Sequence, residues 1–296
     1  MDQDDETEKW REDPEGSVLE WAKSQNYSKK TSETILWLFM KFVDFLEKNK
    51  ISFENVNKTI FSQFINGLTK SVKSRRIYAS QLNSLFSHLE DISLIQENPV
   101  DFQRISGKGR IEKKLPTYLT NEELTVFKKS IENPKTWRKA RERAILFLLI
   151  HTGARCSEIA NLTLDSVQIG EGGGSVRLYG KGRKERDVPL SDEATIAVED
   201  FLAFREGPPG EFLFANKWGT PPTPATIYVM VQKTFAKAGI VKGKLGPHVL
   251  RHTFATRQFA AGTPPAIIKN WLGHASLSTT LIYEHVSGSM GGIRPV

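Results

Sequence analysis

The sequence has one cysteine, Cys156, among its 296 residues. A disulfide framework is therefore excluded, and such cysteine usage fits a reducing compartment, which we expect to be the cytoplasm. No apolar run approaches the roughly 20 residues that a membrane-spanning helix needs, and the acidic N-terminus lacks the pattern of a signal peptide. Neither Cys-x-x-Cys nor His-Glu-x-x-His occurs, so we expect no metal ion, although His248 and His252 have a spacing that zinc ligands also use.

The net charge of +7 conceals an uneven distribution. Residues 1–16 hold eight acidic and two basic residues, a balance of −6 within that total, so the remaining residues carry +13. A basic body favours a nucleic-acid partner, because phosphates neutralised by Lys and Arg release their counterions. Charge alone is weak evidence, since many basic proteins bind no DNA. We interpret residues 1–16 as a disordered acidic tail.

Residues 17–103 are predicted to form an N-terminal helical domain. Apolar residues recur there at helical spacing in four stretches: Val18–Ala22, Ile35–Leu46, Ile60–Leu68 and Ile77–Leu89. Ser32 is expected to cap the second of these helices. Basic residues gather at the start of the fourth helix, and they fit either a solvated helix end or a phosphate-contact patch: Lys70, Lys73, Arg75 and Arg76.

Residues 104–116 combine glycine with a run of basic residues, which is the composition of a flexible, positively charged linker. A basic linker between two basic bodies predicts a clamp that closes around duplex DNA. Four of its residues are expected to contact the DNA backbone: Lys108, Arg110, Lys113 and Lys114.

Residues 117–296 form the second predicted domain. Thr120 and Glu123 fit a capping box at its first helix. The stretch 143–150 (RAILFLLI) is apolar almost throughout, which predicts a buried central helix that Gly153 terminates. Two alternating stretches, 175–179 and 186–190, predict a β-hairpin with Lys181 and Arg183 at its tip. Such a tip is usually no more than polar surface, but an ammonium group there can also contact a groove or protonate a leaving oxygen.

Residues 248–285 gather four of the six histidines, an arginine and a late tyrosine. His248 and Arg251 lie three apart, so a helix places them on one face. A phenol, with a pKa of about 10, is a poor nucleophile at neutral pH, but it can attack a phosphodiester whose developing charge the site absorbs. Arginine matches the non-bridging phosphate oxygens, and imidazole donates to them or moves a proton. This combination predicts phosphoryl transfer through tyrosine, although an Arg–His pair on a helix is more often a surface feature.

Five motifs decide between these readings, and they occur in this order: Thr152-Gly-Ala-Arg-Cys-Ser-Glu, Lys181 on its hairpin, His248-Val-Leu-Arg-His, Leu272-Gly-His and Tyr283. The ordered set resembles the tyrosine recombinases, also called the phage-integrase family, including the Xer-type enzymes. The resemblance covers residues 17–285. It implies a mainly α fold with a small antiparallel β-sheet, in which a helical, SAM-like core-binding domain precedes a mixed α+β catalytic domain of the DNA breaking-rejoining type.

The resemblance also implies a role for each matching residue. Arg155 and Arg251 match the pair that grips the scissile phosphate. Lys181 matches the lysine that protonates the 5′-oxygen leaving group. The remaining matches are His248 as a candidate proton acceptor, His274 as a phosphate-oxygen ligand, Tyr283 as the nucleophile that forms a 3′-phosphotyrosyl bond, and Glu158 as a supporting acid. For His252, which lies in the same motif, we expect a structural role.

The expected activity is site-specific recombination of duplex DNA, by integration, excision or resolution, without cofactor, nucleotide or metal. The expected partners are target DNA and further copies of the chain, as a dimer on each site and a tetramer on two paired sites. Two alternatives stay open, which are a type IB topoisomerase-like enzyme and a non-catalytic DNA-binding protein on the same fold. Family members often carry a further C-terminal helix that docks on a neighbouring subunit, whereas the segment SGSMGGIRPV after Tyr283 is a poor helix former.

Overall fold

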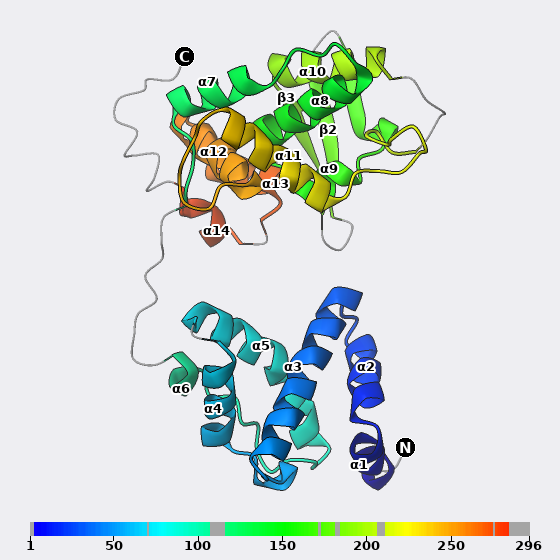
Figure 1. Ribbon diagram of the computed structural model, residues 1–296, viewed down its shortest axis with the longest axis vertical. Coiled ribbons are helices and arrows are strands. Elements are labelled where there is room, and N and C mark those ends of the chain that lie inside the picture. Colours follow the sequence, from blue (N-terminus) through cyan, green and yellow to red (C-terminus); the bar gives the residue numbers. More distant parts are fainter. Residues whose placement is uncertain are drawn as a thin grey trace. The chain divides into compact units, whose positions relative to one another are not determined.

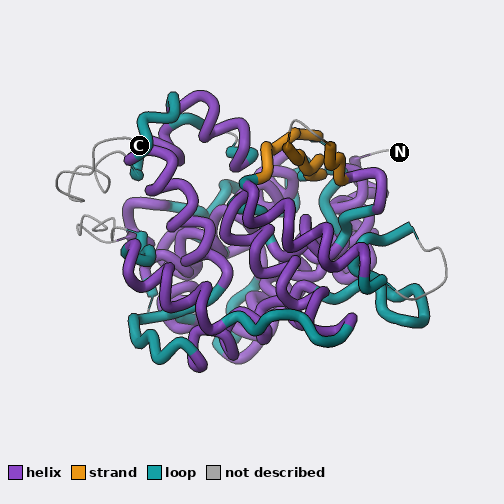
Figure 2. Tube along the Cα trace, turned by 90° about the horizontal axis from the view of Figure 1, so that it is seen from above, coloured by secondary structure: helices purple, strands orange, loops and turns teal. Residues whose placement is uncertain are grey.

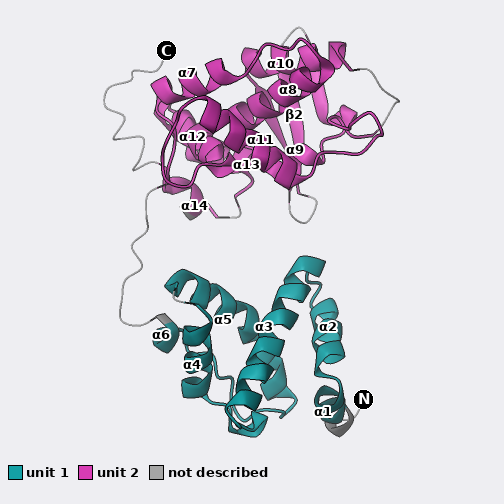
Figure 3. Cartoon of the chain, in the orientation of Figure 1, with its two compact units in different colours: residues 1–113 teal, residues 114–296 magenta. Residues whose placement is uncertain are grey.

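The computed structural model describes residues 3–69, 71–106, 116–170, 173–180, 184–205, 211–274 and 276–283. The chain divides into two compact units, residues 1–113 and residues 114–296 (Figure 3). Each unit has its own hydrophobic core. Within the described residues, no helix combines the length and the apolar character that crossing a membrane requires.

The first unit is helical in its described residues (Figure 1). Its helices are α1 (Gln3–Glu12), α2 (Pro14–Ser24), α3 (Lys29–Lys48), α4 (Lys58–Leu68), α5 (Val72–Asp91) and α6 (Phe102–Ser106). The core is a cluster of aromatic rings around Phe42 of α3, which meets Phe61 and Phe64 of α4 and Phe86 of α5 at centroid separations of 5.0–5.7 Å. Such edge-to-face contacts add specific geometry to the burial of apolar surface.

The second unit combines helices with a small antiparallel sheet (Figures 1 and 2). The strands lie in the order β1 (Val167–Gly170), β2 (Gly173–Tyr179) and β3 (Glu185–Leu190). The helices are α7 (Asn121–Ser130), α8 (Trp137–Thr152), α9 (Cys156–Ala160), α10 (Asp192–Ala203), α11 (Pro224–Lys237), α12 (Pro247–Ala260), α13 (Pro265–Leu272) and α14 (Ser278–Leu281). Helix α8 packs against α10, α12 and β3, and its residues 144–150 are all buried. The predicted central helix is thus confirmed.

Most of the helix caps, helix ends and strands predicted from the sequence are present in the structure. Thr120 and Glu123 make a reciprocal capping box at the start of α7, and Gly153 ends α8 with a left-handed φ of 62°. The predicted hairpin is β2 and β3, which pair with Val176 opposite Val188. Strand β1 was not predicted. Helix α3 begins earlier than expected, because Ser28 rather than Ser32 has the extended backbone of a cap and accepts the amide of Thr31.

The prediction of a disordered acidic tail is wrong for residues 3–12, because they form helix α1. Trp10 is 4% exposed and packs edge-on against Phe39, with their ring centroids 6.3 Å apart. Thr7 donates a hydrogen bond to the carbonyl of Ile92 at 3.1 Å. One buried indole therefore outweighs the acidic composition of this segment.

The start of the predicted linker also needs correction, because residues 104–106 belong to α6 of the first unit. Ile105 is fully buried in the core of that unit, and Arg104 donates to the Thr59 hydroxyl at 2.8 Å. The other basic residues assigned to the linker lie outside the described residues: Lys108, Arg110, Lys113 and Lys114.

If α1 is part of the first unit, Trp10→Ala should lower the free energy of unfolding by about 3 kcal/mol, since it removes a buried aromatic ring. Leu19, which is 41% exposed on α2, provides the control, and Leu19→Ala should cost well under half as much. Denaturant unfolding of the full-length chain measures both. Equal effects of the two substitutions would mean that α1 does not contribute to the core.

Candidate active site

Arg251 lies at the centre of the predicted site and is 5% exposed on α12. Its Nη1 donates to the carbonyl of Gly153 at 2.7 Å, and its Nη2 donates to the carbonyl of Leu272 at 2.6 Å. These carbonyls belong to the C-terminal ends of α8 and α13, where the helix dipole favours a cation. Burial, and then the charge of Arg155, lower the pKa of Arg251 to about 10, so the guanidinium stays charged at neutral pH.

Glycine is needed at both helix ends that Arg251 joins. Gly153 and Gly273 have φ values of 62° and 63°, in the left-handed region that favours glycine. A Cβ atom at position 153 would lie 2.6 Å from the ring of Phe254, and one at position 273 would lie 3.0 Å from Nη1 of Arg186. The close approach of these backbones therefore sets where the guanidinium of Arg251 lies.

Arg155 is the N-cap of α9, and its side chain is 39% exposed. Its backbone N–H and its Nη1 donate to the two carboxylate oxygens of Glu158 at 2.7 and 2.9 Å. Glu158, expected to be a supporting acid, thus makes a charge-assisted contact with a neighbouring arginine. Because only part of the guanidinium is used by Glu158, the exposed part can bind an anion.

Arg186 of β3 is a site residue that the sequence did not single out. Its Nη1 and Nη2 donate to Glu158 at 2.9 and 2.7 Å, and its Nε donates to the carbonyl of Trp271 at 2.7 Å. Both side chains of this ion pair are almost completely buried. Burial on its own raises the pKa of Glu158, but the hydrogen bonds from Arg186 and Arg155 outweigh it, so the pKa lies below its usual value.

Tyr283 follows α14 and is 2% exposed. Its ring packs in a small apolar cluster with Phe254, Ile268 and Leu272, and its hydroxyl lies 2.7 Å from Nδ1 of His252. Burial raises the pKa of the phenol, and the nearby charge of Arg251 lowers it in part. The predicted nucleophile is thus buried beside Arg251, and it contacts a histidine for which only a structural role was expected.

The remaining histidines of the motifs differ in their surroundings. His248 is exposed one turn before His252 on α12, with their ring centroids 6.5 Å apart. His274 lies just after the end of α13, and its Nδ1 is 2.9 Å from the buried hydroxyl of Thr280. Burial, and then the charges of Arg251 and Arg155, lower the pKa of His274 to about 4, so this imidazole is neutral at pH 7.

Several predicted residues cannot be placed, because Lys70, Lys181 and Arg183 lie outside the described residues. Gly180, the residue before Lys181, lies at the Glu158–Arg186 pair, since a Cβ added to it would be 3.9 Å from Glu158 Oε1. In the first unit, Lys73 and Arg76 are exposed in the first turns of α5. Arg75 donates to the side chain of Asn66.

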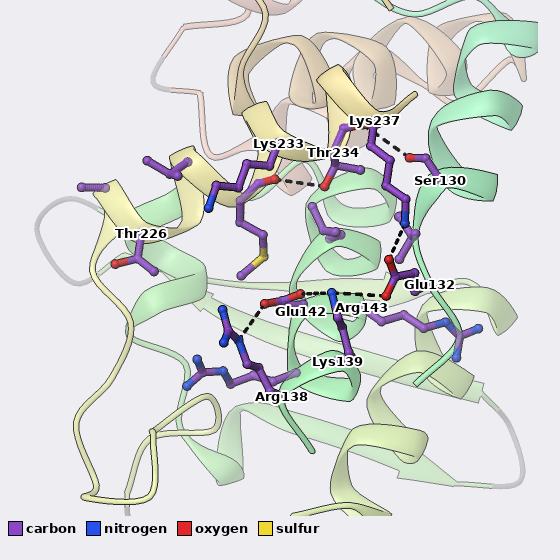
Figure 4. A pocket seen from close by; sticks show the side chains of 16 residues that line it. Ser130, Glu132, Arg138, Lys139, Glu142, Arg143, Thr226, Lys233, Thr234 and Lys237 are labelled. Carbon is purple, nitrogen blue, oxygen red and sulfur yellow. Dashed lines mark hydrogen bonds and ion pairs between the residues drawn. The ribbon is translucent and has the colours of Figure 1, made fainter. Parts of the chain in front are cut away.

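A cavity of about 720 Å³ lies between the start of α8 and α11, away from these residues (Figure 4). A chain of ion pairs links residues that line the cavity: Arg138 with Glu142, Glu142 with Lys139, Lys139 with Glu132, and Glu132 with Lys237. These ion pairs engage part of the charge in the lining, which also includes Arg141 and Lys233. The predicted site is a different place, made of Arg155, Glu158, Arg251, His274 and Tyr283.

This arrangement suits phosphoryl transfer. Arg251 lies near both the phenol of Tyr283 and the neutral imidazole of His274, and Arg155 lies near the same imidazole. Together such groups can stabilise the negative charge that develops on phosphate oxygens. Within the described parts of the chain, no group of three or more His, Cys, Asp or Glu side chains is placed to hold a metal ion. Of the two histidines with zinc-ligand spacing, His252 has its Nδ1 engaged by the phenol.

Comparisons with known proteins agree with this chemistry. The model of the phage integrase family matches residues 117–290. The chain is 33% identical to tyrosine recombinase XerC of Thermodesulfovibrio yellowstonii, over 81% of this chain and 80% of that protein. It is also similar to a crystal structure of the XerH site-specific recombinase bound to a palindromic difH substrate in a post-cleavage complex, with a TM-score of 0.80 and 28% identity, covering 93% and 82% of the two chains. The fold of a λ integrase dimer matches as well, at 15% identity and a TM-score of 0.69.

The buried pair of Glu158 and Arg186 generates a stability prediction. Arg186→Met should lower the free energy of unfolding by about 3–5 kcal/mol, because it leaves a buried carboxylate without its main partner. Adding Glu158→Gln should restore much of that loss, since the unpaired charge is then gone.

The control is Arg177→Met on β2, which breaks the exposed pair with Asp187 and should cost under about 1 kcal/mol. Urea unfolding of the three variants and the parent measures these differences. A double variant no more stable than Arg186→Met would refute the electrostatic explanation.

Proposed function

Because the chain belongs to the phage integrase family, we propose that Tyr283 is the nucleophile that breaks and rejoins DNA at specific sites. The chain is a tyrosine recombinase, and the matching relatives favour this over a topoisomerase-like or a purely DNA-binding role. In the proposed reaction the phenol oxygen attacks the scissile phosphorus. A 3′-phosphotyrosyl bond forms, and the bond to the 5′-oxygen breaks.

The observation that carries this proposal is the position of Arg251, which lies near both the phenol of Tyr283 and the imidazole of His274. Arg251 is close enough to Tyr283 to lower the pKa of its hydroxyl, and Arg155 and Arg251 both act on His274. In the proposed site, Arg155 and Arg251 bind the non-bridging phosphate oxygens, and the neutral His274 donates a hydrogen bond to one of them. Glu158 holds Arg155 in place.

The phosphotyrosyl bond keeps the free energy of the phosphodiester that it replaces. A 5′-hydroxyl from the same or another strand can therefore reverse the reaction, and rejoining needs no nucleotide. The same groups stabilise the charge in both directions, because the transition state is shared.

The proposed partner is duplex DNA, contacted by both units. We assign backbone contacts to basic residues of the first unit, the segment that follows it and the hairpin: Lys70, Lys73, Arg75, Arg76, Lys108, Arg110, Lys113, Lys114 and Arg183. The difH substrate of XerH is described as palindromic, and a two-fold symmetric site is bound by two copies of a protein. We propose a dimer on each site and a tetramer on two paired sites.

The role of the nucleophile is tested by Tyr283→Phe. This variant should still bind target DNA, and it should form no covalent adduct on nicked suicide substrates, because the attacking oxygen is missing. The control is Tyr228→Phe on α11, which removes a phenol that accepts a hydrogen bond from Gln232 and should leave adduct formation intact. Undiminished adduct in Tyr283→Phe would place the nucleophile at another residue.

The proposed role of Lys181 is to protonate the departing 5′-oxygen. Lys181→Ala should slow cleavage by roughly 10²–10⁴-fold, the usual contribution of a general acid. Replacing the bridging 5′-oxygen by sulfur creates a thiolate leaving group that needs no proton, so the variant should then cleave almost as fast as the parent.

Arg155→Ala is the matched control, because its charge acts on the non-bridging oxygens, which the sulfur substitution leaves unchanged. Its defect should persist on both substrates. If Lys181→Ala is equally impaired on both, the lysine positions DNA and the acid is another group.

A further inference from the structure

The hydroxyl of Tyr283 has a specific neighbour in the structure. It lies 2.7 Å from Nδ1 of His252, and the two rings are tilted by 45° with centroids 5.5 Å apart. Among the described residues, this is the hydrogen bond that the phenol makes, and no hydrogen bond joins His248 to it. His248 is exposed one turn earlier on the same helix.

We propose that His252 is the proton acceptor for Tyr283, in the tautomer that carries hydrogen on Nε2 and leaves Nδ1 free to accept. The inference rests on the proposed nucleophilic role of Tyr283 and deepens it. As the phenol oxygen forms its bond to phosphorus, the O–H bond breaks and the proton moves to Nδ1 of His252. The P–O5′ bond breaks at the same time, and the leaving oxygen takes its proton from Lys181. In the rejoining step the imidazolium returns its proton to the tyrosine.

The surroundings of His252 suit this role. Burial, and then the charges of His248 and Arg251, lower its pKa to about 4, so Nδ1 is unprotonated at neutral pH and able to accept. A phosphate bound by Arg251 brings negative charge that offsets the effect of the guanidinium. The imidazole therefore becomes more basic when the substrate is in place, which is when the proton must move.

The position of His252 on α12 also supports the proposal. It directly follows Arg251, whose guanidinium is fixed by the carbonyls of Gly153 and Leu272. The proton acceptor and a phosphate-binding arginine are thus consecutive residues of one rigid helix. His248, nearer the surface, is left to contact the phosphate or the DNA backbone.

The experiment measures single-turnover adduct formation on nicked suicide DNA by His252→Asn. The side-chain oxygen of asparagine can occupy the place of Nδ1 and accept the hydrogen bond, but it cannot take up the proton. Cleavage should slow by roughly 10²–10⁴-fold, while DNA affinity and the thermal unfolding midpoint stay close to those of the parent. His252→Gln serves as a second variant if the first does not fold.

A second arm separates proton transfer from positioning. A fluorinated tyrosine, whose phenol is more acidic, is incorporated at position 283 of the parent and of each variant. A nucleophile that loses its proton more easily depends less on a base, so the defect of His252→Asn should shrink by at least tenfold. The matched control is His274→Asn, which removes another neutral imidazole of the site, and its defect should stay unchanged.

Three outcomes would overturn the proposal. His252→Asn cleaving as fast as the parent, or faster, would mean that His252 only holds the tyrosine at rest. An undiminished defect with the fluorinated tyrosine would assign His252 to positioning. His248→Asn is measured in the same way, and rescue of its defect by the fluorinated tyrosine without rescue of His252→Asn would assign the base to His248. Absence of any Tyr283-dependent adduct in the parent would instead refute the proposed function itself.

Discussion

The buried carboxylate of Glu158 is the contact on which the site depends. It is shared by Arg155 and Arg186, and Arg186 also binds the backbone at Trp271. One carboxylate thereby connects the start of α9, strand β3 and the end of α13. A charge buried to this degree is tolerated only when it is fully paired, so the three elements are held in a single relative arrangement. The position of the partly exposed guanidinium of Arg155 is a consequence of that arrangement.

Much of the second unit could be predicted from local sequence. The apolar run of α8, the capping box of Thr120 and Glu123, and the hairpin of β2 and β3 depend on near neighbours and were expected. The mainly helical fold with a small antiparallel sheet is confirmed. Strand β1 was missed because it has only four residues, Val167–Gly170, and so short an alternation of half-buried and exposed positions is a weak signal.

Two contacts of the site, those of Arg186 and of His252, were not predicted from the sequence, for different reasons. Arg186 is in phase with Val188 and Leu190, which face inward on β3, so the alternation itself indicated that a guanidinium is buried there. His252 carries no such signal, because its partner Tyr283 lies 31 residues further along the chain. Trp10 shows the same limit in the first unit, where a tertiary contact with Phe39 overrides an acidic composition. The positions of these side chains depend on contacts between segments that are distant in the sequence.

The short segment between α13 and Tyr283 has a mechanical consequence. The side chain of Thr280 hydrogen-bonds to His274, and its carbonyl accepts the backbone N–H of Tyr283. The candidate nucleophile Tyr283 and His274 are thereby both hydrogen-bonded to one threonine. A displacement of Thr280 therefore changes the positions of the phenol and of the imidazole together. The two side chains are coupled through hydrogen bonds to a single residue of the chain.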